Sequence, residues 1–318
     1  MPNHPTPPAP YRGRFAPTPS GPLHFGSLVA AVGSYLDAKA QQGEWLLRIE
    51  DLDPPRAVAG SIDDILKTLE RFGFEWDGPI LYQSQRFDLY QAALEKLLAQ
   101  GLLYGCACSR KEIADSAAHG LDGLIYPGTC RRGLAQGKQA RAWRILVPST
   151  PICFEDRVLG TQTQNLATEI GDFILKRADG LFSYQLAVVV DDAETLITDI
   201  VRGADLLLST ARQLFLQNAL GYPTPHHAHL PLALNRQGDK LSKQNLAKSL
   251  ADQPRSQALA DALTFLGHPP PTSLLGAPLR DLWAWAIKHW QLKNVPIRAS
   301  NSPLRYDEAK QAKPIFKN

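Results

Sequence analysis

The sequence of 318 residues contains no apolar run that approaches the length of a membrane span. Its first ten residues hold five prolines and lack the apolar core of a secretory signal, so we expect a disordered tail there. An excess of one charge is also missing, because the net charge of +3 permits nucleic-acid binding without requiring it. These absences predict a globular protein of the cytoplasm with room for about two domains.

Cysteine is scarce, and three of the four cysteines cluster at Cys106, Cys108 and Cys130. In a cytosolic chain this clustering indicates a metal site more than a disulfide. Thiolates are preferred zinc ligands, so we expect one structural Zn²⁺, although the C-x-C spacing is tighter than usual. From chemistry alone His119 is the default fourth ligand. Cys153 has no partner nearby and is expected to be a small buried hydrophobe.

Two common nucleotide-binding signatures, the Walker loop and G-x-G-x-x-G, are missing. Residues 14–28 instead read RFAPTPSGPLHFGSL, a short strand that breaks at prolines and restarts as a helix at Leu28. The N-terminus of a helix after a tight loop attracts anions. His24 and Ser27 can donate hydrogen bonds to phosphate, and Gly26 allows close approach of the backbone. Taken alone, the stretch also fits a proline-rich turn without function.

Strand and helix signals alternate along most of the chain, which predicts an α/β fold with a doubly wound, Rossmann-type parallel sheet. Glu50 directly follows a predicted strand, at the edge where such sheets bind ligands. Ser61 is expected to cap a helix. Strands are predicted at residues 44–49, 80–82, 186–190, 196–201 and 229–234. Helices are predicted at residues 61–72, 86–100, 209–220, 257–265 and 279–291.

The alternation is interrupted by a segment rich in glycine, cysteine and arginine, with short strands expected at residues 142–147, 152–154 and 172–176. We therefore predict an insertion within the sheet-building domain. The expected organisation is a disordered tail (1–10), a Rossmann-type catalytic domain (11–105 and 179–245), a zinc-containing inserted domain (106–178), a small C-terminal helical subdomain (246–292) and a loosely held tail (293–318).

A second motif, GDKLSKQ at residues 238–244, follows the last predicted strand. Lys240 and Lys243 could place two ammonium groups on a triphosphate, with the hydroxyl of Ser242 beside them. An exposed Lys-x-x-Lys loop is common, so its value lies in its position. It follows both the stretch at residues 14–28 and the insertion.

In this order the motifs resemble the class I aminoacyl-tRNA synthetases. HFGS is similar to their HIGH signature and KLSKQ to their KMSKS loop, while RFAPTPSG is similar to the glutamyl branch. SYQLAVVVDD (183–192) and TDIVRG (198–203) resemble its glutamate pocket. The resemblance covers about residues 11–245 and stops where an anticodon-binding domain would begin. With the three-cysteine insertion, that truncation resembles the glutamyl-queuosine tRNA(Asp) synthetase family.

This resemblance implies tRNA-independent, ATP-dependent activation of L-glutamate to glutamyl adenylate. Glutamate is then transferred to the queuosine base at the wobble position of tRNA(Asp). The implied partners are L-glutamate, ATP with Mg²⁺, and tRNA(Asp) carrying queuosine; we expect a monomer without membrane association. Arg131, Arg132 and Arg141 are expected to contact tRNA phosphates.

The resemblance also assigns site residues. His24 and Lys243 are the expected catalytic residues. The implied ATP site consists of His24, Gly26, Ser27, Lys240, Ser242 and Lys243. The implied glutamate site consists of Arg14, Phe15, Ala16, Pro17, Thr18, Glu50, Tyr184 and Arg202. The implied zinc ligands are Cys106, Cys108, Tyr126 and Cys130, with Tyr126 in place of His119.

Within the glutamate site each residue has an expected role. Arg14 and Arg202 would bind the side-chain carboxylate, because a guanidinium grips a carboxylate with two hydrogen bonds. Glu50 would bind the α-ammonium group, and Tyr184 would form a wall with a hydrogen bond. For Arg202 the alternative is a surface salt bridge with a nearby aspartate.

Three other functions fit parts of this pattern. The first is a truncated glutamyl-tRNA synthetase that charges the 3′ end of a tRNA. The second is a catalytically silent RNA-binding relative, and the third is a small-molecule nucleotidyltransferase with a HIGH-like motif. The glutamate-pocket segments disfavour the third, and the motif residues retained in the sequence disfavour the second.

Overall fold

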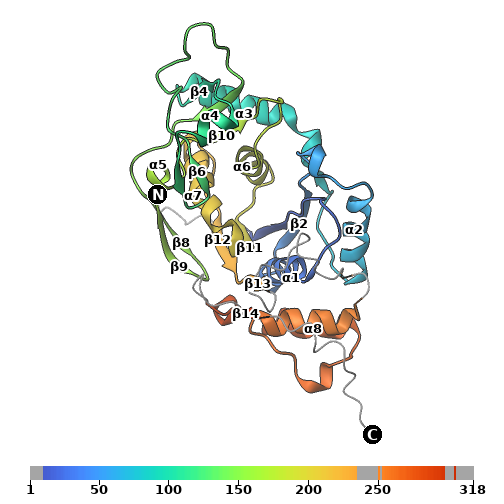
Figure 1. The fold of residues 1–318 in the computed structure, drawn as a ribbon. Helices are drawn as coiled ribbons and strands as arrows, with labels where there is room; N and C mark the ends of the chain where they lie inside the picture. The colour runs from blue at the N-terminus through green and yellow to red at the C-terminus, as the bar shows by residue number, and fades with distance from the viewer. Residues whose placement is uncertain (1–9, 235–249, 251–252, 298–303, 306–318) are drawn as a thin grey trace, which may run out of the picture.

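A parallel sheet forms the centre of the protein in this computed structural model, which describes residues 10–234, 250, 253–297 and 304–305. Strands β1 (Arg12–Phe15), β2 (Glu44–Ile49) and β3 (Leu81–Tyr82) pair in parallel in this order. On the other side of β1 lie the parallel strands β11 (Asp199–Gly203) and β12 (His226–Leu230). The N–H of Thr198 donates to the carbonyl of Arg12 at 3.0 Å and joins β11 to β1 (Figure 1). The predicted Rossmann-type parallel sheet is confirmed.

The helices of the described chain are α1 (Phe25–Ala40), α2 (Ser61–Arg71), α3 (Phe87–Ala99), α4 (Arg110–Ala114), α5 (Leu166–Glu169), α6 (Tyr184–Glu194), α7 (Leu207–Leu220), α8 (Arg255–Phe265) and α9 (Leu279–His289). Helix α1 packs on the parallel sheet, α8 and α9 pack on α1, and α3, α6 and α7 pack against one another. Short 3₁₀ turns lie at Pro54–Arg56, Gln83–Gln85, Ala204–Leu206, Thr272–Leu274 and Leu292–Asn294. The predicted boundaries of α2, α3, α7, α8 and α9 agree with the structure within two residues at each end.

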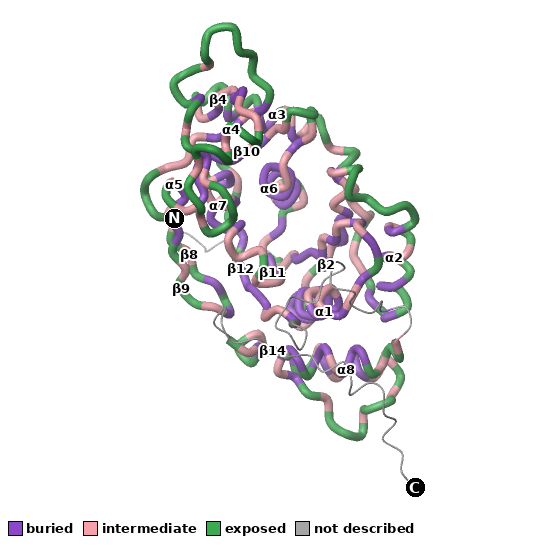
Figure 2. Tube along the Cα trace, in the orientation of Figure 1, coloured by how far each residue is buried: buried purple, intermediate pink, exposed green. Residues whose placement is uncertain are grey.

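Helix α6 corrects a prediction, because residues 186–190 form part of this helix and not a strand. The run is apolar on every face, since α6 is buried along most of its length, and periodicity cannot separate such a helix from a buried strand. Ser183 caps the helix by accepting the N–H of Leu186 at 3.4 Å. Figure 2 shows α6 and α1 as the buried helices at the centre of the molecule.

Two helix starts also differ from prediction. Helix α1 begins at Phe25, three residues before the expected start, because the side chain of His24 caps it. Helix α2 is preceded by Gly60 in a left-handed conformation, with φ of 76°, and not by Ser61 as the cap. The hydroxyl of Ser61 instead donates to the carbonyl of Gly21 at 3.0 Å and ties α2 to the loop before α1.

The segment predicted as an insertion contributes β7 (Ala142–Ile145) and β10 (Ile174–Lys176) to an antiparallel sheet with β4 (Leu103–Cys106), in the order β10-β7-β4. Strand β4 begins three residues before the predicted start of the insertion. A hairpin of β5 (Ala118–Gly120) and β6 (Gly123–Ile125) lies beside this sheet. A second hairpin, β8 (Ile152–Asp156) and β9 (Gly160–Gln164), pairs with β12 through Asp156 and His227. Part of the segment therefore extends the sheet that contains β11 and β12. The predicted domain boundaries stay predictions.

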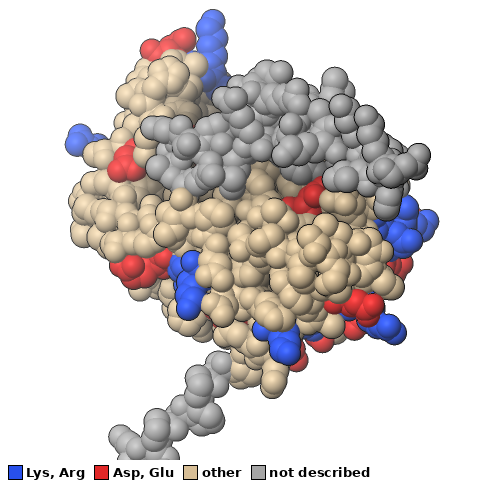
Figure 3. Space-filling model, turned by 90° about the horizontal axis from the view of Figure 1, so that it is seen from below, with Lys and Arg blue, Asp and Glu red and all other residues tan. Residues whose placement is uncertain are grey.

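None of the helices that the structure describes has the length and apolar character needed to cross a membrane. Figure 3 views the protein from below, and among the residues coloured there acidic and basic side chains are scattered toward the edge of this face. The small net charge is therefore not gathered into one basic field on the visible part of this face.

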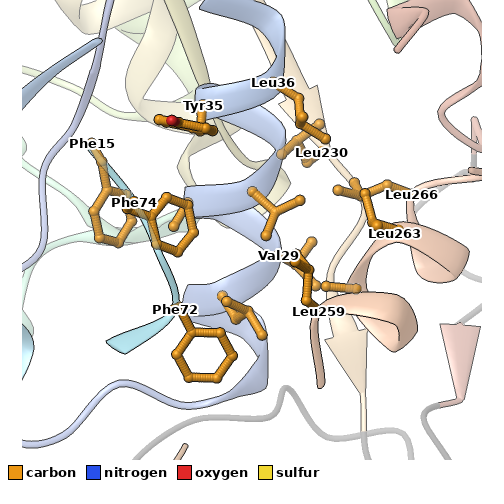
Figure 4. Packing of buried hydrophobic residues seen from close by; sticks show 14 of the residues in the cluster. Phe15, Val29, Tyr35, Leu36, Phe72, Phe74, Leu230, Leu259, Leu263 and Leu266 are labelled. Carbon is orange, nitrogen blue, oxygen red and sulfur yellow. The ribbon is translucent and has the colours of Figure 1, made fainter. Parts of the chain in front are cut away.

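The main hydrophobic core surrounds α1. Phe15 and Phe74 pack on one side of this helix, and Leu259 and Leu263 of α8 lie on the other (Figure 4). Helix α9 adds Trp283, whose indole N–H donates to the carbonyl of Phe72 at 2.8 Å. The C-terminal helices thus complete the core around α1.

Some of the described residues after 293 make defined contacts, while the tail at residues 293–318 stays a prediction. Val295 is 2% exposed and belongs to the core around α1. Further on, β14 (Leu304–Arg305) pairs in parallel with β13 (Ala233–Leu234). Burial of an apolar side chain and backbone pairing hold these positions against the proline-rich composition that suggested a tail.

Candidate active site

The predicted nucleotide-binding stretch leaves the sheet at the carboxyl end of β1. The N–H of Glu50 donates to the carbonyl of Pro17 at 3.0 Å, so the loop after β1 lies beside the end of β2. On the other side of β1, Arg202 lies near the end of β11. The order of the strands reverses at β1, and open α/β sheets bind ligands at this switch point. The fold therefore brings these predicted site residues to the expected edge.

The imidazole of His24 occupies the N-terminus of α1. The Nδ1 atom of the ring accepts the backbone N–H of Ser27 at 3.3 Å, and the backbone carbonyl of His24 accepts the N–H of Leu28 at 3.0 Å. An Nδ1 that accepts a hydrogen bond is unprotonated, so a neutral His24 carries its proton on Nε2. Gly26 and Ser27 lie in the first turn of the helix. His24 thus combines a helix cap with an N–H donor at the positive end of a helix dipole.

Arg14 and Glu50 belong to a buried network of ion pairs. The Nε and Nη2 atoms of Arg14 each donate to Asp192 at 3.1 Å. Arg48 donates to Asp192 at 2.6 Å and to Glu50 at 3.1 Å. Burial alone would raise the pKa of Asp192, but the charges of Arg14 and Arg48 lower that pKa to about 2. Asp192 is therefore ionised, and the network holds Arg14 and Glu50 in place without a ligand.

The neighbouring Asp191 connects other elements. Its carboxylate accepts hydrogen bonds from Gln83 and Arg86 at 2.7 Å each, and from Tyr90 at 2.9 Å. These bonds tie α3 and the turn before it to α6. The two neighbouring carboxylates of α6 thus bind different partners. Asp192 binds Arg14 and Arg48, and Asp191 binds residues of α3 and the turn before it.

Arg202 is buried, with 5% of its surface exposed, and no described carboxylate lies within ion-pair distance. Its Nε donates to Nε2 of His229 at 3.1 Å and its Nη2 to the hydroxyl of Thr210 at 2.9 Å. Its Nη1 is buried and has no hydrogen-bond partner among the residues that the structure describes. Burial lowers the pKa of this guanidinium. The surface salt bridge considered as the alternative for Arg202 is excluded by this burial.

Tyr184 is the first residue of α6. Burial raises the pKa of its phenol, and the charge of Glu50 raises it further, so the phenol keeps its proton. Burial also raises the pKa of Glu50, although Arg48 opposes the change. The charges of Glu50 and Arg202 act on the pKa of Tyr184 in opposite directions.

Other predicted residues of the glutamate site contribute differently. The side chain of Phe15 lies in the core and stacks on Trp45, with ring centroids 6.1 Å apart, so only its backbone faces the loop. Pro17 is buried, while Ala16 and Thr18 are half-buried. Lys240, Ser242 and Lys243 lie outside the residues that the structure describes.

The three clustered cysteines meet in the segment between β4 and β7. The sulfur atoms of Cys106, Cys108 and Cys130 all lie within 4.8 Å of one another, and all are free thiols. The hydroxyl of Tyr126 lies 3.4 Å from the sulfur atoms of Cys106 and Cys108. His119 lies exposed on β5 and is not part of this group. The donor set suits a thiophilic metal such as zinc.

Three further side chains of the predicted insertion have defined surroundings in the structure. The guanidinium of Arg144 lies 3.9 Å above the ring of Tyr126. Arg131, expected on tRNA phosphate, pairs with the buried Asp172 through a hydrogen bond of 2.7 Å. Cys153 is exposed on β8, contrary to the predicted burial, because it points from the solvent-facing side of a two-stranded hairpin.

Sequence reasoning missed four residues that hold the site together: Arg48, Asp192, His229 and Asp156. Arg48 had a signal, since an arginine inside an otherwise apolar strand needs a buried anion. His229 follows two other histidines in a buried strand, which is also unusual. Nothing local pointed to Asp156, whose partner is 73 residues away.

Comparison with known proteins agrees with this architecture. Residues 11–270 match the family described as "tRNA synthetases class I (E and Q), catalytic domain". The chain is 60% identical over 290 residues to a glutamyl-Q tRNA(Asp) synthetase of Dechloromonas aromatica, covering 91% of this chain and 96% of that protein. It is 56% identical over 294 residues to a protein of the same name from Chromobacterium violaceum, covering 92% and 98%.

A solved structure is similar over most of the fold. The glutamate-tRNA synthetase of Elizabethkingia anophelis superposes with a TM-score of 0.77 and 25% identity. The match covers 95% of this chain and 69% of that one. The aligned part of the larger enzyme thus has the architecture of nearly the whole chain described here.

Proposed function

We propose the following reaction for this chain, which belongs to the glutamyl-Q tRNA(Asp) synthetase family within the class I tRNA synthetases. The protein activates L-glutamate with ATP and transfers it to the queuosine base of tRNA(Asp). It is an enzyme of the ligase type, related to the aminoacyl-tRNA synthetases. In the first step the α-carboxylate of glutamate attacks the α-phosphorus of ATP and pyrophosphate leaves. In the second, a hydroxyl of queuosine attacks the activated carbonyl and AMP leaves.

The single observation that carries the substrate assignment is that the guanidinium of Arg202 is buried and that no described carboxylate pairs with it. A buried cation without a counter-ion is costly, and an unpaired buried N–H adds to that cost. The side-chain carboxylate of glutamate would supply both the charge and the hydrogen-bond acceptor that Nη1 of Arg202 lacks. Glutamine would supply a weaker, neutral acceptor, and aspartate would be about one methylene too short.

The rest of the pocket fits the two remaining groups of glutamate. Two nitrogens of Arg14, Nε and Nη2, donate to Asp192, so Nη1 would be the atom that donates to the substrate carboxylate. Glu50, held by Arg48, is the anion we assign to the α-ammonium group. The connected ion pairs and Arg202 together hold four guanidinium groups (Arg14, Arg48, Arg86 and Arg202) and three carboxylates (Asp191, Asp192 and Glu50). One positive charge remains, which the side chain of glutamate would neutralise.

ATP is assigned to the N-terminus of α1. The proton on Nε2 of His24 would point at the phosphates, with the backbone of the first turn, including Gly26 and Ser27, around them. Lys240, Ser242 and Lys243 remain the expected partners of the leaving pyrophosphate. Mg²⁺ would bind mainly through the phosphates of ATP. In this scheme the protein positions the reactants and stabilises charge, and forms no covalent bond to them.

We assign one structural zinc ion to Cys106, Cys108, Tyr126 and Cys130. The three thiols and the phenol converge, and thiolates are the ligands zinc prefers. When bound, the metal would hold β4, the β5–β6 hairpin and the following turn together. Arg131, Arg132 and Arg141 near this segment stay candidates for tRNA phosphates, with Arg131 already shared with Asp172. We further propose that the enzyme is a monomer and acts in the cytoplasm.

Two assays test this function. Glutamate-dependent exchange of pyrophosphate into ATP should occur without RNA, and glutamine and aspartate should be poor substrates. Labelled glutamate should then be transferred to tRNA(Asp) that carries queuosine, and not to queuosine-free tRNA(Asp) or to tRNA(Glu). Periodate oxidation confined to the 3′ terminus should leave this transfer intact. Exchange that requires tRNA, together with charging that periodate abolishes, would instead establish a truncated glutamyl-tRNA synthetase.

A further inference from the structure

A chain of hydrogen bonds leads to Arg202, the residue proposed to bind the substrate carboxylate. It begins at Asp156, at the end of β8. One oxygen of Asp156, Oδ1, accepts the backbone N–H groups of Val158 at 3.0 Å, Leu159 at 2.8 Å and His229 at 3.2 Å. The other oxygen, Oδ2, lies 2.6 Å from Nδ1 of His229. The backbone thus fixes one edge of the carboxylate and leaves the other edge for the imidazole.

The ionised carboxylate determines which nitrogen of His229 carries the proton. Burial alone would raise the pKa of Asp156, but the hydrogen bond from His229 lowers it, so this carboxylate is an acceptor only. Nδ1 of His229 must therefore donate. Nε2 of His229 must accept, because Nε of Arg202, which can only donate, lies 3.1 Å from it, and the ring is therefore neutral. Burial, which lowers the pKa of His229, agrees with this state. The ring itself is completely buried, with 0% exposure.

That acceptor faces Arg202. Nε of Arg202 donates to it at 3.1 Å, and the hydroxyl of Thr210 lies 3.2 Å from it. Thr210 in turn accepts Nη2 of Arg202 at 2.9 Å. Two of the three guanidinium nitrogens are therefore fixed by this arrangement, and the plane of the guanidinium cannot rotate. With the opposite tautomer, an N–H of His229 would face the N–H of Arg202 and push it away.

We propose that Asp156 and His229 are positioning residues that set the orientation of Arg202, so that Nη1 meets the side-chain carboxylate of glutamate. The neutral ring has a clear advantage over a carboxylate in the same place. A carboxylate would also orient Arg202, but it would neutralise the charge that the substrate must neutralise. The imidazole orients the guanidinium and leaves its charge for glutamate, which favours glutamate over glutamine. This inference rests on the proposed function.

Two substitutions of His229 separate its two hydrogen bonds. In His229→Gln the side-chain oxygen can take the place of Nε2 and still accept from Arg202. In His229→Asn the amide can take the place of Nδ1 and bind Asp156, but nothing reaches Arg202. A lost hydrogen bond to a charged group changes binding by about tenfold to a hundredfold. We therefore expect KM for glutamate to rise about tenfold or more in His229→Asn, and by less than about threefold in His229→Gln.

In the same exchange assay, KM for ATP should stay unchanged in both variants, and the preference for glutamate over glutamine should fall in His229→Asn. The matched control is His268→Asn, since His268 is also buried but accepts the backbone N–H of Gln291 and packs on Trp290 in the C-terminal helices. It should leave KM for glutamate at the wild-type value. A general loss of stability would affect kcat or yield in both the control and the His229 variants.

Equal effects of the Asn and Gln variants, or a wild-type KM in His229→Asn, would overturn the proposal while glutamate activation by the wild type still stands. Absence of glutamate-dependent exchange in the wild type would instead overturn the proposed function itself. If neither His229 variant is soluble, Thr210→Val provides the decision, because it keeps the shape and removes the nearer of the two acceptors of Nη2, the other being the carbonyl of Leu206 at 3.4 Å. It should raise KM for glutamate several-fold, and an unchanged value would contradict the proposal.

Discussion

The ion-pair network beside β1 and the cysteine cluster of the inserted segment are both sets of ligand-type side chains, but they are assembled in opposite ways. Arg14 and Asp192, which bind each other in the network, are 178 residues apart in the sequence. Cys108 and Cys130, in the cluster, are separated by 22 residues. The network supplies anions for its own cations, whereas the cluster holds thiols and a phenol that make only weak hydrogen bonds to one another.

The two sites therefore differ in what fixes their side chains, which is ion pairing within the protein in the network and metal binding in the cluster. A network that neutralises its own charges is in place before the substrate arrives, so less ordering is left for binding. A cluster of thiols gains its strong bonds only with a metal, and metal binding is then coupled to local folding. We therefore expect substitutions in the network to affect stability or catalysis directly. Substitutions in the cluster should act through the metal.

The largest effect is expected from Asp192→Asn. Removing this carboxylate leaves Arg14 and Arg48 buried without their shared anion, which should lower the free energy of unfolding by about 3–5 kcal/mol. Urea unfolding at neutral pH measures this change. Asp179→Asn is the control, because Asp179 is an exposed partner of Arg177 and should change stability by less than about 1 kcal/mol. Equal stability of the two variants would show that the network does not organise the pocket.

The pH dependence sharpens the same point. The pKa of Asp192 is about 2 in the folded protein, below the value of about 3.9 expected in the unfolded chain. A lowered pKa contributes stability that is fully present above pH of about 4 and is lost as the pH falls toward 2. The difference in unfolding free energy between wild type and Asp192→Asn should therefore shrink in this window. A difference that stays constant from neutral pH to pH of about 2 would contradict the assignment.

Arg202→Ala should give the next largest effect. Without this guanidinium the side-chain carboxylate of glutamate would lose its main counter-ion, and kcat/KM for glutamate should fall about a thousandfold. The ATP–pyrophosphate exchange assay measures the change, and Arg202→Lys should recover part of it because it keeps the charge. Arg280→Ala is the control, since the Arg280 side chain is 88% exposed. Activity of Arg202→Ala within about tenfold of the wild type would place the substrate carboxylate elsewhere.

Cys108→Ser tests the independence of the two regions. Losing one of three thiolates should lower zinc affinity by about a hundredfold, so the purified variant should lose the one zinc per chain that we expect in the wild type. Metal analysis of both proteins measures this loss. KM for glutamate should remain within about twofold, because Arg202 and its partners lie outside the cluster. A large rise in KM would show that the cluster supports the pocket.

The smallest effect concerns the fourth ligand of the metal. Tyr126→Phe removes the hydroxyl that lies among the thiols and should weaken zinc binding by about tenfold. His119→Ala should leave the affinity unchanged, since His119 is exposed and outside the cluster. Competition with a chelator of known affinity measures both. The reverse result would restore His119 as the ligand.

Much of the architecture could be predicted because its signals are local. Strand β2 and helices α2, α3 and α8 were predicted from short patterns of apolar residues and turns. The parallel sheet followed from their alternation. Helix α6 was missed as a helix because every face of it is buried, which removes the periodic polar residues that mark helices. The capping of α1 by His24 was missed because histidine is not a usual cap.

The candidate site was predicted in part. The sequence predicts Arg14, Glu50, Tyr184 and Arg202 as site residues. Arg14, Glu50 and Arg202 lie at or near the ends of β1, β2 and β11, and Tyr184 begins α6. Their partners were not named, since an ion pair such as Arg48 with Asp192 joins residues 144 positions apart. No pattern in the sequence indicates which of two buried arginines will receive a carboxylate from the protein.

The class of fold, the order of the motifs and the residue types that can bind phosphate, carboxylate and zinc follow from the sequence, because each depends on neighbours close in the chain. Which of these groups already have a partner within the protein follows from the three-dimensional arrangement. Arg14 pairs with the carboxylate of Asp192, which neutralises its charge, whereas Arg202 donates to a neutral histidine, which does not. The physical reason is that pairing and burial depend on distances in space, and folding sets those distances between residues that the sequence keeps far apart.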